Sequence, residues 1–539
     1  MRRTLKLAPL VAAAMVLAAC GGGDGGGTTD SGGGGGSAAA GEPTPGGEIT
    51  VLEDAAFAGS WPAGLDPATN TTGGSNIAIN QAIFGGLFLL TADDDGANAE
   101  VTPNQAESSE FSEDGTTFTV KLRDGIQFSD GTPLDAEAVK FNWDRDLANP
   151  CTCKPTWPLA PNGITVVDPL TVQLQFTRPY PAIMASFPAS NVNWIASPTA
   201  LEKAGEDAFK ITPVGAGPFT VVSNQLSSAV ELAKNPNYFK ENLPYLDKLT
   251  FQSIGGDQPA YQALQAGQAD VYEGLNTTPL LEQAQQNDQL QVTVQPATSP
   301  YVIQLNTKIA PFNDVKAREA IYRATDFDAI NKGIFRGTYD VSQSFTGPGG
   351  KFYEPEVEGY PEYDLEKAKQ LVQEVGGITV RLGTISNYVA TQINTALQTQ
   401  WQEAGIEVEI NDYQLAGLIQ EFTGGQWQAM LQTAGAWDPA AGVGVGFRFQ
   451  SGVPYSGVND PALDELLNNA SATLDEGQRA DLYRQAGELI AQNFYAPFGL
   501  AFAPANLSVK GVHGPGLDTK IPPILVNAGV IWDEVWQEQ

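Results

Sequence analysis

Side chains that act as nucleophiles, general bases or metal ligands are scarce in this chain of 539 residues. It contains one histidine, His513, and three cysteines, Cys20, Cys151 and Cys153. A hydrolase with a serine or cysteine nucleophile and a histidine base would depend on His513, whose Val-His-Gly-Pro context predicts a surface loop. A site with several histidine ligands cannot be built from one histidine. We therefore predict no metal site, no cofactor and no catalytic residue.

Carboxylates are abundant instead. Asp and Glu number 62 against 29 Lys and Arg, which gives a formal net charge of -33. This balance argues against a nucleic-acid partner and against adsorption to anionic lipid. The chain has no Gly-x-Ser-x-Gly or His-Glu-x-x-His motif, and 347–351 (Gly-Pro-Gly-Gly-Lys) lacks the spacing of a phosphate loop. A pair of acids that hydrolyses glycosides stays open as an alternative, because carboxylates are too numerous to exclude one.

Cys20 has a distinct setting at the start of the chain. Basic residues at 2, 3 and 6 precede a short apolar run that ends in Leu-Ala-Ala-Cys at 17–20. The run is shorter than the ~20 residues of a membrane span, and its pattern predicts a secretory signal over 1–19. Leu-Ala-Ala-Cys resembles the lipobox of bacterial lipoproteins, which implies cleavage before Cys20 and a lipid on its sulfur.

A tether follows the predicted lipid site. Residues 20–46 are mostly Gly, Ser, Ala and Thr, with almost no large apolar side chain. Such a segment cannot bury enough surface to offset its ordering entropy. We expect a flexible link that holds the globular part outside the cell, at the outer face of the membrane.

Cys151 and Cys153 are flanked by Pro150 and Pro155. The secretory signal implies a compartment in which disulfides persist. A bond between residues two apart needs a tight turn, which the prolines favour. We predict a local staple, since two thiols without other ligands nearby do not make a zinc site.

The rest of the chain alternates strand and helix patterns. Strands are expected at 49–52, 118–122, 164–167, 170–176, 378–382 and 406–410, and helices at 136–143, 364–375, 389–404, 461–472 and 476–492. The segment 378–410 reads as a βαβ unit, which implies parallel strands with a right-handed crossover. The chain is therefore an α/β protein with more than one lobe.

A series of motifs follows in a fixed order along the chain: Leu65-Asp66-Pro67, the long segment 122–139, Gly215–Phe219, Asn235–Tyr238, Tyr261–Val271, Leu305–Thr307, Pro311–Val315 and Arg318–Ile321. This series is similar to the extracellular solute-binding proteins of family 5, which include the oligopeptide- and dipeptide-binding lipoproteins of ABC importers. Together the motifs span nearly the whole chain after the tether. Their Asp-Gly and Gly-Pro steps set turns, and Asp135 is placed to cap a helix.

The resemblance implies a two-lobed clamp like the periplasmic binding proteins, of type II in its large three-domain form, with a hinge between the lobes. Domain I would comprise 47–84, 211–297 and 495–539, and domain II 85–210. Domain III, the second lobe, would comprise 298–494. The hinge crossings would lie near Pro296–Pro300 and Phe494–Pro497.

The resemblance also implies where solute binds. In the family's peptide binders, an Asp of the third domain that follows a strand pairs with the ligand's ammonium. Asp438 is the matching carboxylate here and Trp437 the matching wall. Trp61, Trp194 and Tyr301 lie in segments that approach the cleft in the family. Each of these residues could equally serve ordinary packing, and the small-residue run 440–446 departs from the family pattern.

The function implied is a substrate-binding lipoprotein of an ABC importer. It would be a monomer that captures a peptide by lobe closure, with membrane permease subunits as partners and no enzymatic activity. Three alternatives stay open. The same scaffold could bind an oligosaccharide, an opine or a metal chelate, the chain could be a surface hydrolase, or it could serve adhesion or signalling.

Overall fold

The computed structural model describes residues 41–539, except 58, 60, 71–75, 149–156, 434–436, 442–443 and 525–528. Cys20, Cys151, Cys153 and most of the predicted tether therefore lie outside the described residues. The chain divides into two units, 1–41 and 42–539, and the second unit is described below.

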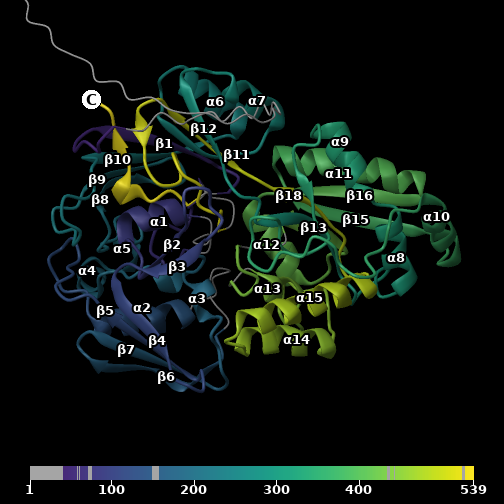
Figure 1. Ribbon diagram of the computed structural model, residues 1–539, viewed down its shortest axis with the longest axis horizontal. Helices are drawn as coiled ribbons and strands as arrows, with labels where there is room; N and C mark the ends of the chain where they lie inside the picture. The colour runs from purple at the N-terminus through teal and green to yellow at the C-terminus, as the bar shows by residue number, and fades with distance from the viewer. Residues whose placement is uncertain are drawn as a thin grey trace, which may run out of the picture. The chain divides into compact units, whose positions relative to one another are not determined.

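A seven-stranded mixed sheet forms the centre of the first lobe, at the upper left of Figure 1. Its strands, in spatial order, are β12 (Leu290–Val294), β19 (Ala505–Val509), β11 (Val271–Leu275), β1 (Glu48–Asp54), β10 (Lys248–Ile254), β9 (Ala229–Lys234) and β8 (Phe219–Gln225). Helix α1 (Ile77–Phe84) contributes to the hydrophobic cluster on one face, and α6 (Asp257–Gln265) and α7 (Thr278–Gln285) to the cluster on the other. Strands β1, β10 and β11 are parallel.

The first lobe has a second part with its own core. A four-stranded antiparallel sheet orders β4 (Ala106–Phe111), β5 (Thr117–Leu122), β7 (Thr171–Phe176) and β6 (Leu159–Asp168). Its core packs against α2 (Ala136–Ala148) around Trp143. The remaining elements are β2 (Phe88–Thr91), β3 (Glu100–Pro103), α3 (Ile183–Ser186), η2 (Asn191–Asn193), α4 (Pro198–Ala204) and α5 (Glu206–Phe209).

A six-stranded mixed sheet forms the second lobe, at the right of Figure 1. Its order is β14 (Asp340–Val341), β18 (Phe498–Phe502), β13 (Ser299–Leu305), β17 (Ala429–Thr433), β15 (Ile378–Ile385) and β16 (Ile406–Tyr413). The helices of this lobe are α8 (Val315–Arg323), α9 (Phe327–Ile334), α10 (Leu365–Glu374), α11 (Tyr388–Glu403), α12 (Leu415–Gly424), α13 (Val445–Phe449), α14 (Pro461–Ala472) and α15 (Glu476–Gln492).

Several local predictions are confirmed. Strands β15 and β16 pair in parallel on either side of α11, as the βαβ pattern predicts. The strands predicted at 164–167 and 170–176 lie in β6 and β7, which pair as a hairpin where Asp168 accepts a hydrogen bond from the backbone N–H of Leu170 at 2.9 Å. Asp135 caps α2 by accepting from the N–H of Ala138 at 2.9 Å. Such a cap satisfies one of the N–H groups that a helix start leaves without a partner.

The chain crosses between the lobes twice, and the two crossings are paired. Val294 pairs with Ala505 in the first sheet, and Ser299 pairs with Phe502 in the second, both antiparallel. Between them the N–H of Gln295 donates to the carbonyl of Pro504 at 2.9 Å. The hinge is therefore a two-stranded ribbon. Its return crossing lies at 503–504, after the predicted segment 494–497, because β18 belongs to the second lobe.

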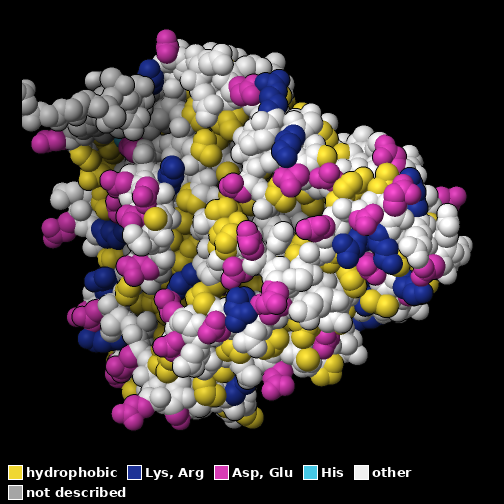
Figure 2. All heavy atoms as spheres, turned by 45° about the vertical axis from the view of Figure 1, so that its right-hand side comes forward, with side chains coloured by type: hydrophobic (Ala, Val, Ile, Leu, Met, Phe, Trp, Pro, Cys, Tyr) yellow, Lys and Arg dark blue, Asp and Glu magenta, His cyan; other side chains and the backbone are white. Residues whose placement is uncertain are grey.

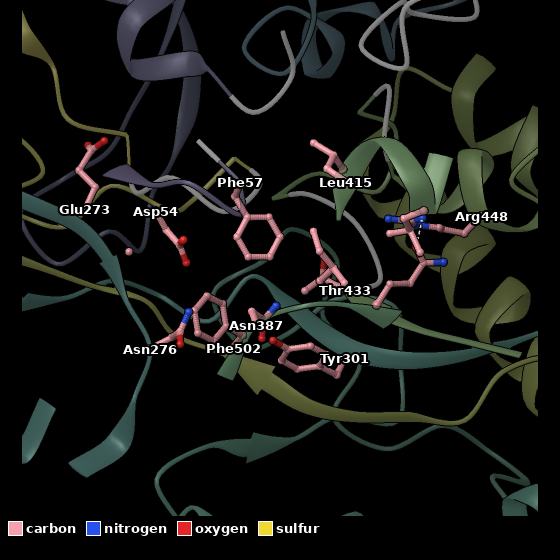
Figure 3. Close-up of a pocket in the computed structure, with 14 residues that line it drawn as sticks. Asp54, Phe57, Glu273, Asn276, Tyr301, Asn387, Leu415, Thr433, Arg448 and Phe502 are labelled. Atoms are coloured by element: carbon pink, nitrogen blue, oxygen red, sulfur yellow. Dashed lines mark hydrogen bonds between the residues drawn. The ribbon is translucent and has the colours of Figure 1, made fainter. Parts of the chain in front are cut away.

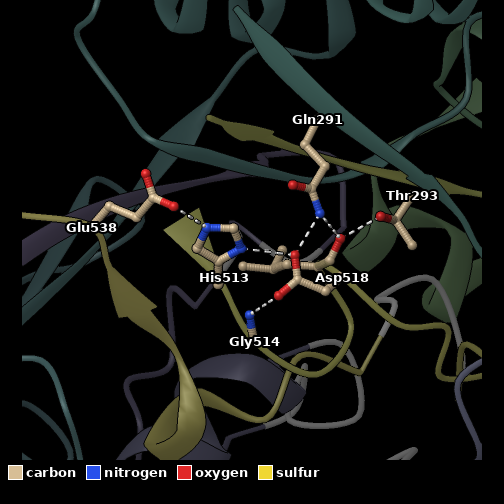
Figure 4. A network of polar contacts seen from close by, with 7 residues as sticks. Gln291, Thr293, His513, Gly514, Asp518 and Glu538 are labelled. Atoms are coloured by element: carbon tan, nitrogen blue, oxygen red, sulfur yellow. Dashed lines mark hydrogen bonds and ion pairs between the residues drawn. The ribbon is translucent and has the colours of Figure 1, made fainter. Parts of the chain in front are cut away.

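His513 is buried, so the surface loop predicted for it is wrong. It lies in β20 (Val512–His513), which pairs with β21 (Trp536–Gln537) near the end of the chain, just after η3 (Trp532–Glu534). Its ring stacks on Trp536 with centroids 4.5 Å apart, and its two nitrogens lie 3.1 Å from Asp518 and 3.3 Å from Glu538 (Figure 4). The imidazole joins parts of the C-terminal segment to one another, and Asp518 in turn accepts a hydrogen bond from Gln291 of β12 at 2.7 Å.

Acidic side chains are scattered over the face drawn in Figure 2, where Lys and Arg lie among them. The net charge of -33 is therefore not gathered into one acidic patch on this face. Within the described residues, no helix has both the length and the apolar character that a membrane crossing requires.

Candidate functional site: a cavity between the lobes

The carboxyl ends of parallel strands from both sheets meet around one cavity. β1 and β11 end there in the first lobe, and β15 and β17, which are also parallel, end there in the second. Ligands of open α/β sheets bind at such strand ends. The cavity has a volume of about 160 Å3 and is lined by Asp54, Phe57, Glu273, Gly274, Asn276, Tyr301, Ile385, Asn387, Leu415, Leu418, Gln432, Thr433, Arg448 and Phe502.

One end of the cavity is acidic and belongs to the first lobe. Asp54 ends β1, and Glu273 lies on the neighbouring strand β11 (Figure 3). Glu53 precedes Asp54 and is 1% exposed, while Glu273 is 6% exposed. Parallel pairing of Val51 with Val271 places Glu53 and Glu273 on the same face of the sheet. We call Asp54 and Glu273 the acidic end of the cavity; Glu53 lies beside Glu273 without lining the cavity.

All four carboxyl oxygens of Glu53 and Glu273 are buried, and within the described residues none makes a hydrogen bond of normal length and angle. Burial raises the pKa of Glu273 to about 8, and the backbone of Val530 lowers this pKa by a smaller amount. Burial, and then the neighbouring Glu273, raises the pKa of Glu53 well above its usual value. Burial also raises the pKa of Asp54, although the N–H of Ala56 donates to it at 2.9 Å. The acidic end holds protons that a nearby positive charge would displace.

The opposite end of the cavity is basic and belongs to the second lobe. Arg448, on α13, is the one residue with a positive charge among the described residues that line the cavity. Its guanidinium donates to Gln432 and lies 5.1 Å from the ring centroid of Phe447. Its Nε atom is buried without a partner. Burial lowers the pKa of Arg448 to about 10, so it stays charged at neutral pH.

Apolar and amide side chains line the space between the two ends. Phe57, Tyr301, Phe502 and Leu415 lie between Asp54 and Arg448 in Figure 3, with Asn276, Asn387 and Thr433 among them. Aromatic walls with a few polar groups are typical of small-molecule sites. Burial raises the pKa of Tyr301, so its hydroxyl stays protonated.

A second hollow continues the cavity. It has a volume of about 510 Å3 and shares Asp54, Asn276 and Asn387 with the inner cavity. The start of α6 and the residues around Tyr388 also line it. The described residues that line this outer hollow include no Lys or Arg. A solute longer than the inner cavity would therefore extend past Asp54 into the outer hollow.

Direct contacts join the two lobes on either side of the cavity. Arg178 of the first lobe donates to the side chain of Asn468 on α14 at 3.0 Å and to its carbonyl at 3.3 Å. The hydroxyl of Tyr339 in the second lobe donates to the carbonyl of Asn276 at 2.8 Å. Arg336 and Glu282 form an ion pair across the lobes. These contacts define a closed form.

Of the residues predicted to meet solute, Tyr301 lines the cavity. Trp61, Trp194 and Trp437 belong instead to one hydrophobic cluster, centred on the first lobe, and none of the three lines the cavity. The indole N–H of Trp61 donates to Asn224 at 3.1 Å. Trp437 comes from the second lobe, so it packs across the boundary. Contact between these tryptophans and solute stays a prediction.

Asp438 is 3% exposed and lies beside Arg479 of α15, with 3.5 Å between carboxylate and guanidinium. The backbone N–H of Ala440 also donates to it at 2.8 Å. Arg479 lies 4.9 Å from the ring centroid of Phe352. The charge of Asp438 is therefore compensated within the second lobe, away from the cavity lining. Its role as a ligand carboxylate stays a prediction.

Sequence reasoning missed the charged residues that line the cavity. A signal for Glu273 was its place in Val271–Leu275, where a charge interrupts an apolar strand. Asp54 lies two residues after the strand predicted at 49–52. Arg448 lies just after the small-residue run and had no such signal. Within the described residues, no cluster of three or more His, Cys, Asp or Glu is arranged to hold a metal ion.

A cavity closed between two α/β lobes that are joined by a hinge ribbon defines a solute-binding protein of the clamp class. The sequence model of the bacterial extracellular solute-binding proteins, family 5 (middle region), matches residues 100–452. The chain belongs to this family.

Proteins similar to this chain bind small solutes. The glutathione-binding protein GsiB of Shigella flexneri is 29% identical over 439 residues, which cover 77% of this chain and 82% of GsiB. The GsiB of Salmonella paratyphi A is 31% identical over 343 residues, which cover 62% of this chain and 64% of that protein.

Solved structures share the fold, which is that of the type II periplasmic binding proteins. DppA of Helicobacter pylori, in complex with the peptide STSA, superposes with a TM-score of 0.78 at 22% identity, covering 92% of this chain and 99% of DppA. AgaA of A. tumefaciens R10, in complex with agropinic acid, gives the same TM-score, identity and coverages. The predicted two-lobed clamp is confirmed.

Proposed function

We propose that this protein captures a short peptide in the cavity between its lobes and presents it to the membrane subunits of an ABC importer. The observation that carries the proposal is the charged cavity itself, with Arg448 at one end and Asp54 at the other. A peptide has a carboxylate and an ammonium, and it matches this pair of charges. The similarity to GsiB supports a peptide of the size of glutathione.

The dimensions of the site support a short peptide. The inner cavity of about 160 Å3 is smaller than the roughly 300–1,000 Å3 of typical ligand pockets. A dipeptide or tripeptide would fill it and reach the outer hollow past Asn276 and Asn387. The aromatic walls would cover its side chains, and the amides would meet its backbone.

Lobe closure supplies the transport signal in this proposal. Arg178, Asn468 and Tyr339 make their contacts across the lobes in the closed form. A solute that touches both lobes binds the closed form better than the open form and shifts the population toward it. The membrane subunits would recognise the closed form. The protein itself makes and breaks no bond and acts as a monomer.

The proposal is tested by retention. Purified protein is incubated with an equimolar mixture of dipeptides, tripeptides and glutathione, and the retained compounds are identified by mass spectrometry. We expect peptides to be retained, with at least tenfold weaker binding in Arg448→Met. Arg381→Met, which removes an arginine from an exposed site on β15, is the matched control and should bind like the wild type. Retention of no peptide would contradict the proposal.

An opine is the second candidate solute. The similarity to AgaA, whose structure holds agropinic acid, favours it. An opine with carboxylate and amine groups would use the same two ends of the cavity. Adding agropinic acid and an oligosaccharide series to the mixture separates these solutes from peptides in one measurement.

We also propose that Cys20 carries a lipid that holds the protein at the outer face of the cell membrane. The basic start, the short apolar run and Leu-Ala-Ala-Cys support this proposal. Cells fed with labelled palmitate should incorporate label into the wild type and not into Cys20→Ala, which should leave the membrane fraction. Label retained by Cys20→Ala would contradict the lipid assignment.

A further inference from the structure

The acidic end of the cavity has carboxyl groups that make few hydrogen bonds within the fold. Asp257 nearby is a contrast, because its carboxylate accepts from the hydroxyl of Tyr272 at 2.6 Å and from the N–H and hydroxyl of Thr277 at 2.8 and 2.5 Å. Asp257 therefore orders the loop after β11. Asp54 accepts one hydrogen bond from Ala56, and Glu53 and Glu273 accept none.

Unpartnered buried carboxylates cost stability, and a fold keeps them where something else benefits. Both oxygens of Glu273 are buried without a partner at the edge of a cavity that Glu273 lines. Among the described residues that line the cavity and the outer hollow on the side of the first lobe, none is a lysine or an arginine. A positive charge at this end would have to come from outside these residues.

Asp54 is the group placed to meet this cation. In Figure 3 it lies between Glu273 and Phe57, and it borders both the inner cavity and the outer hollow. Glu273 lines the same cavity from β11, and the carboxylate whose charge acts on Asp54 is Asp257, which borders the outer hollow with it. A cation at Asp54 would thus pair with Asp54 and have Asp257 nearby.

We propose that the acidic end is a subsite for a cationic group of the solute, a primary ammonium or a guanidinium, which pairs directly with Asp54. Arg448 takes an anionic group of the same molecule in the other lobe. The solute is then a zwitterion whose two charges attach to different lobes, so each charge contributes to closure. This inference rests on the proposed function, and it names the chemical class of the solute and its orientation.

The inference differs from the expectation drawn from family resemblance, which assigns the ammonium to Asp438. The two assignments place the amino group on opposite sides of the lobe boundary. Asp438 already has Arg479 as a partner at 3.5 Å, whereas no described cation lies beside Asp54 among the residues that line its cavity. An amino group is therefore held more strongly at Asp54.

The test compares peptides with and without the amino charge. The mixture of dipeptides and tripeptides is offered to the wild type in free and in N-acetylated form, and dissociation constants are measured by calorimetry for the best-retained peptide. We expect acetylation to weaken binding by about ten- to a hundredfold, the range of one charge-assisted hydrogen bond. Equal retention of both forms by the wild type would overturn the inference and leave the proposed function standing.

Variants then locate the subsite. Asp54→Asn should weaken binding of the free peptide by a similar factor and should bind the free and acetylated forms equally, since the partner of the amino group is gone. Asp412→Asn, which changes an exposed aspartate near the end of β16 in the other lobe, is the matched control and should keep the wild-type preference. Glu273→Gln should reduce the preference by a smaller factor.

Two outcomes decide against Asp54. If Asp54→Asn keeps the preference for the free amine, or if Asp438→Asn removes it, the ammonium binds elsewhere. If the wild type retains no peptide in either form, the proposed function fails, and this subsite fails with it. Thermal melting of each variant checks folding, and the acetylation arm needs no variant.

Discussion

Two buried acids at the boundary of the lobes have opposite surroundings. Asp438 lies in the second lobe beside Arg479 and accepts a hydrogen bond from Ala440, so its charge is neutralised by its own domain. Glu273 lies in the first lobe with Glu53 as its neighbour and with no hydrogen-bond partner. A carboxylate that the fold has already paired stabilises the fold, while one that the fold has left unpaired is available to a solute. In our proposal this difference separates a structural acid from a functional one, which residue type alone does not do.

The largest expected effect comes from breaking the paired acid. Arg479→Met would leave Asp438 as a buried charge without its cation and should reduce the free energy of unfolding by about 3–5 kcal/mol. Urea denaturation measures the loss. The double variant Asp438→Asn/Arg479→Met should recover part of this stability, because the unpaired charge is then absent. A single variant as stable as the wild type would show that the pair is not structural.

The unpaired acid should respond to pH instead. The pKa of Glu273 is raised from 4.5 to about 8, so its burial costs nothing below pH 4.5, and the cost grows until pH 8. Wild type should therefore lose about 2–3 kcal/mol of stability relative to Glu273→Gln between pH 5 and pH 8. Thermal and urea unfolding of both proteins across this range measure the difference. Asp146→Asn, at another buried acid without a hydrogen-bond partner, shows whether any such site gives the same profile.

The number of protons released when solute binds should also distinguish the two acids. Below pH 8 the acidic end holds a proton on Glu273, and a cation bound at Asp54 should displace part of it. Binding at pH 7 should release up to about one proton, seen as a dependence of the calorimetric enthalpy on the ionisation heat of the buffer. Glu273→Gln should abolish most of this dependence, and Asp438→Asn should not change it. Identical enthalpies in all buffers would contradict the linkage.

The smallest effect is expected at a contact between the lobes that involves neither Asp438 nor Glu273. Arg178→Ala removes the two hydrogen bonds to Asn468 that join the lobes in the closed form. Because these bonds are partly exposed, the loss should be about 1 kcal/mol, which weakens solute binding about fivefold. X-ray scattering with saturating peptide should show the closed form again. A loss of a hundredfold would mean that closure depends on this contact more than on the charges of the cavity.

Much of the fold could be predicted from the sequence because the patterns are local. The parallel pair β15–β16, the hairpin β6–β7 and the caps at Asp135 and Asp364 each depend on residues close together in the chain. The ordered family motifs then fixed the two-lobed arrangement. The return crossing at 503–504 was missed because β18 and β19 are short, and pairing partners decide to which lobe they belong.

The site was harder to predict because it is assembled from distant segments. Asp54, Glu273 and Arg448 come together through the pairing of β1 with β11 and the closure of two lobes, and no spacing in the chain encodes that. Trp61, Trp194 and Trp437 were predicted to contact solute partly because large aromatic side chains form good binding walls. Large aromatic side chains are equally suited to a hydrophobic core. Asp438 has a cation beside it because it pairs with Arg479, which lies 41 positions further along the chain. Such a distant partner could not be predicted from the residues around Asp438.

The ribbon of paired crossings constrains how the halves can move. A single linker would permit twisting and sliding, but two antiparallel connections that are bonded through Gln295 and Pro504 resist torsion. Bending about one axis remains the easy motion. The facing surfaces of the two lobes should then meet in the same alignment each time the protein closes. The distance between Asp54 and Arg448 in the closed form would therefore set the separation of charges that a bound solute must have.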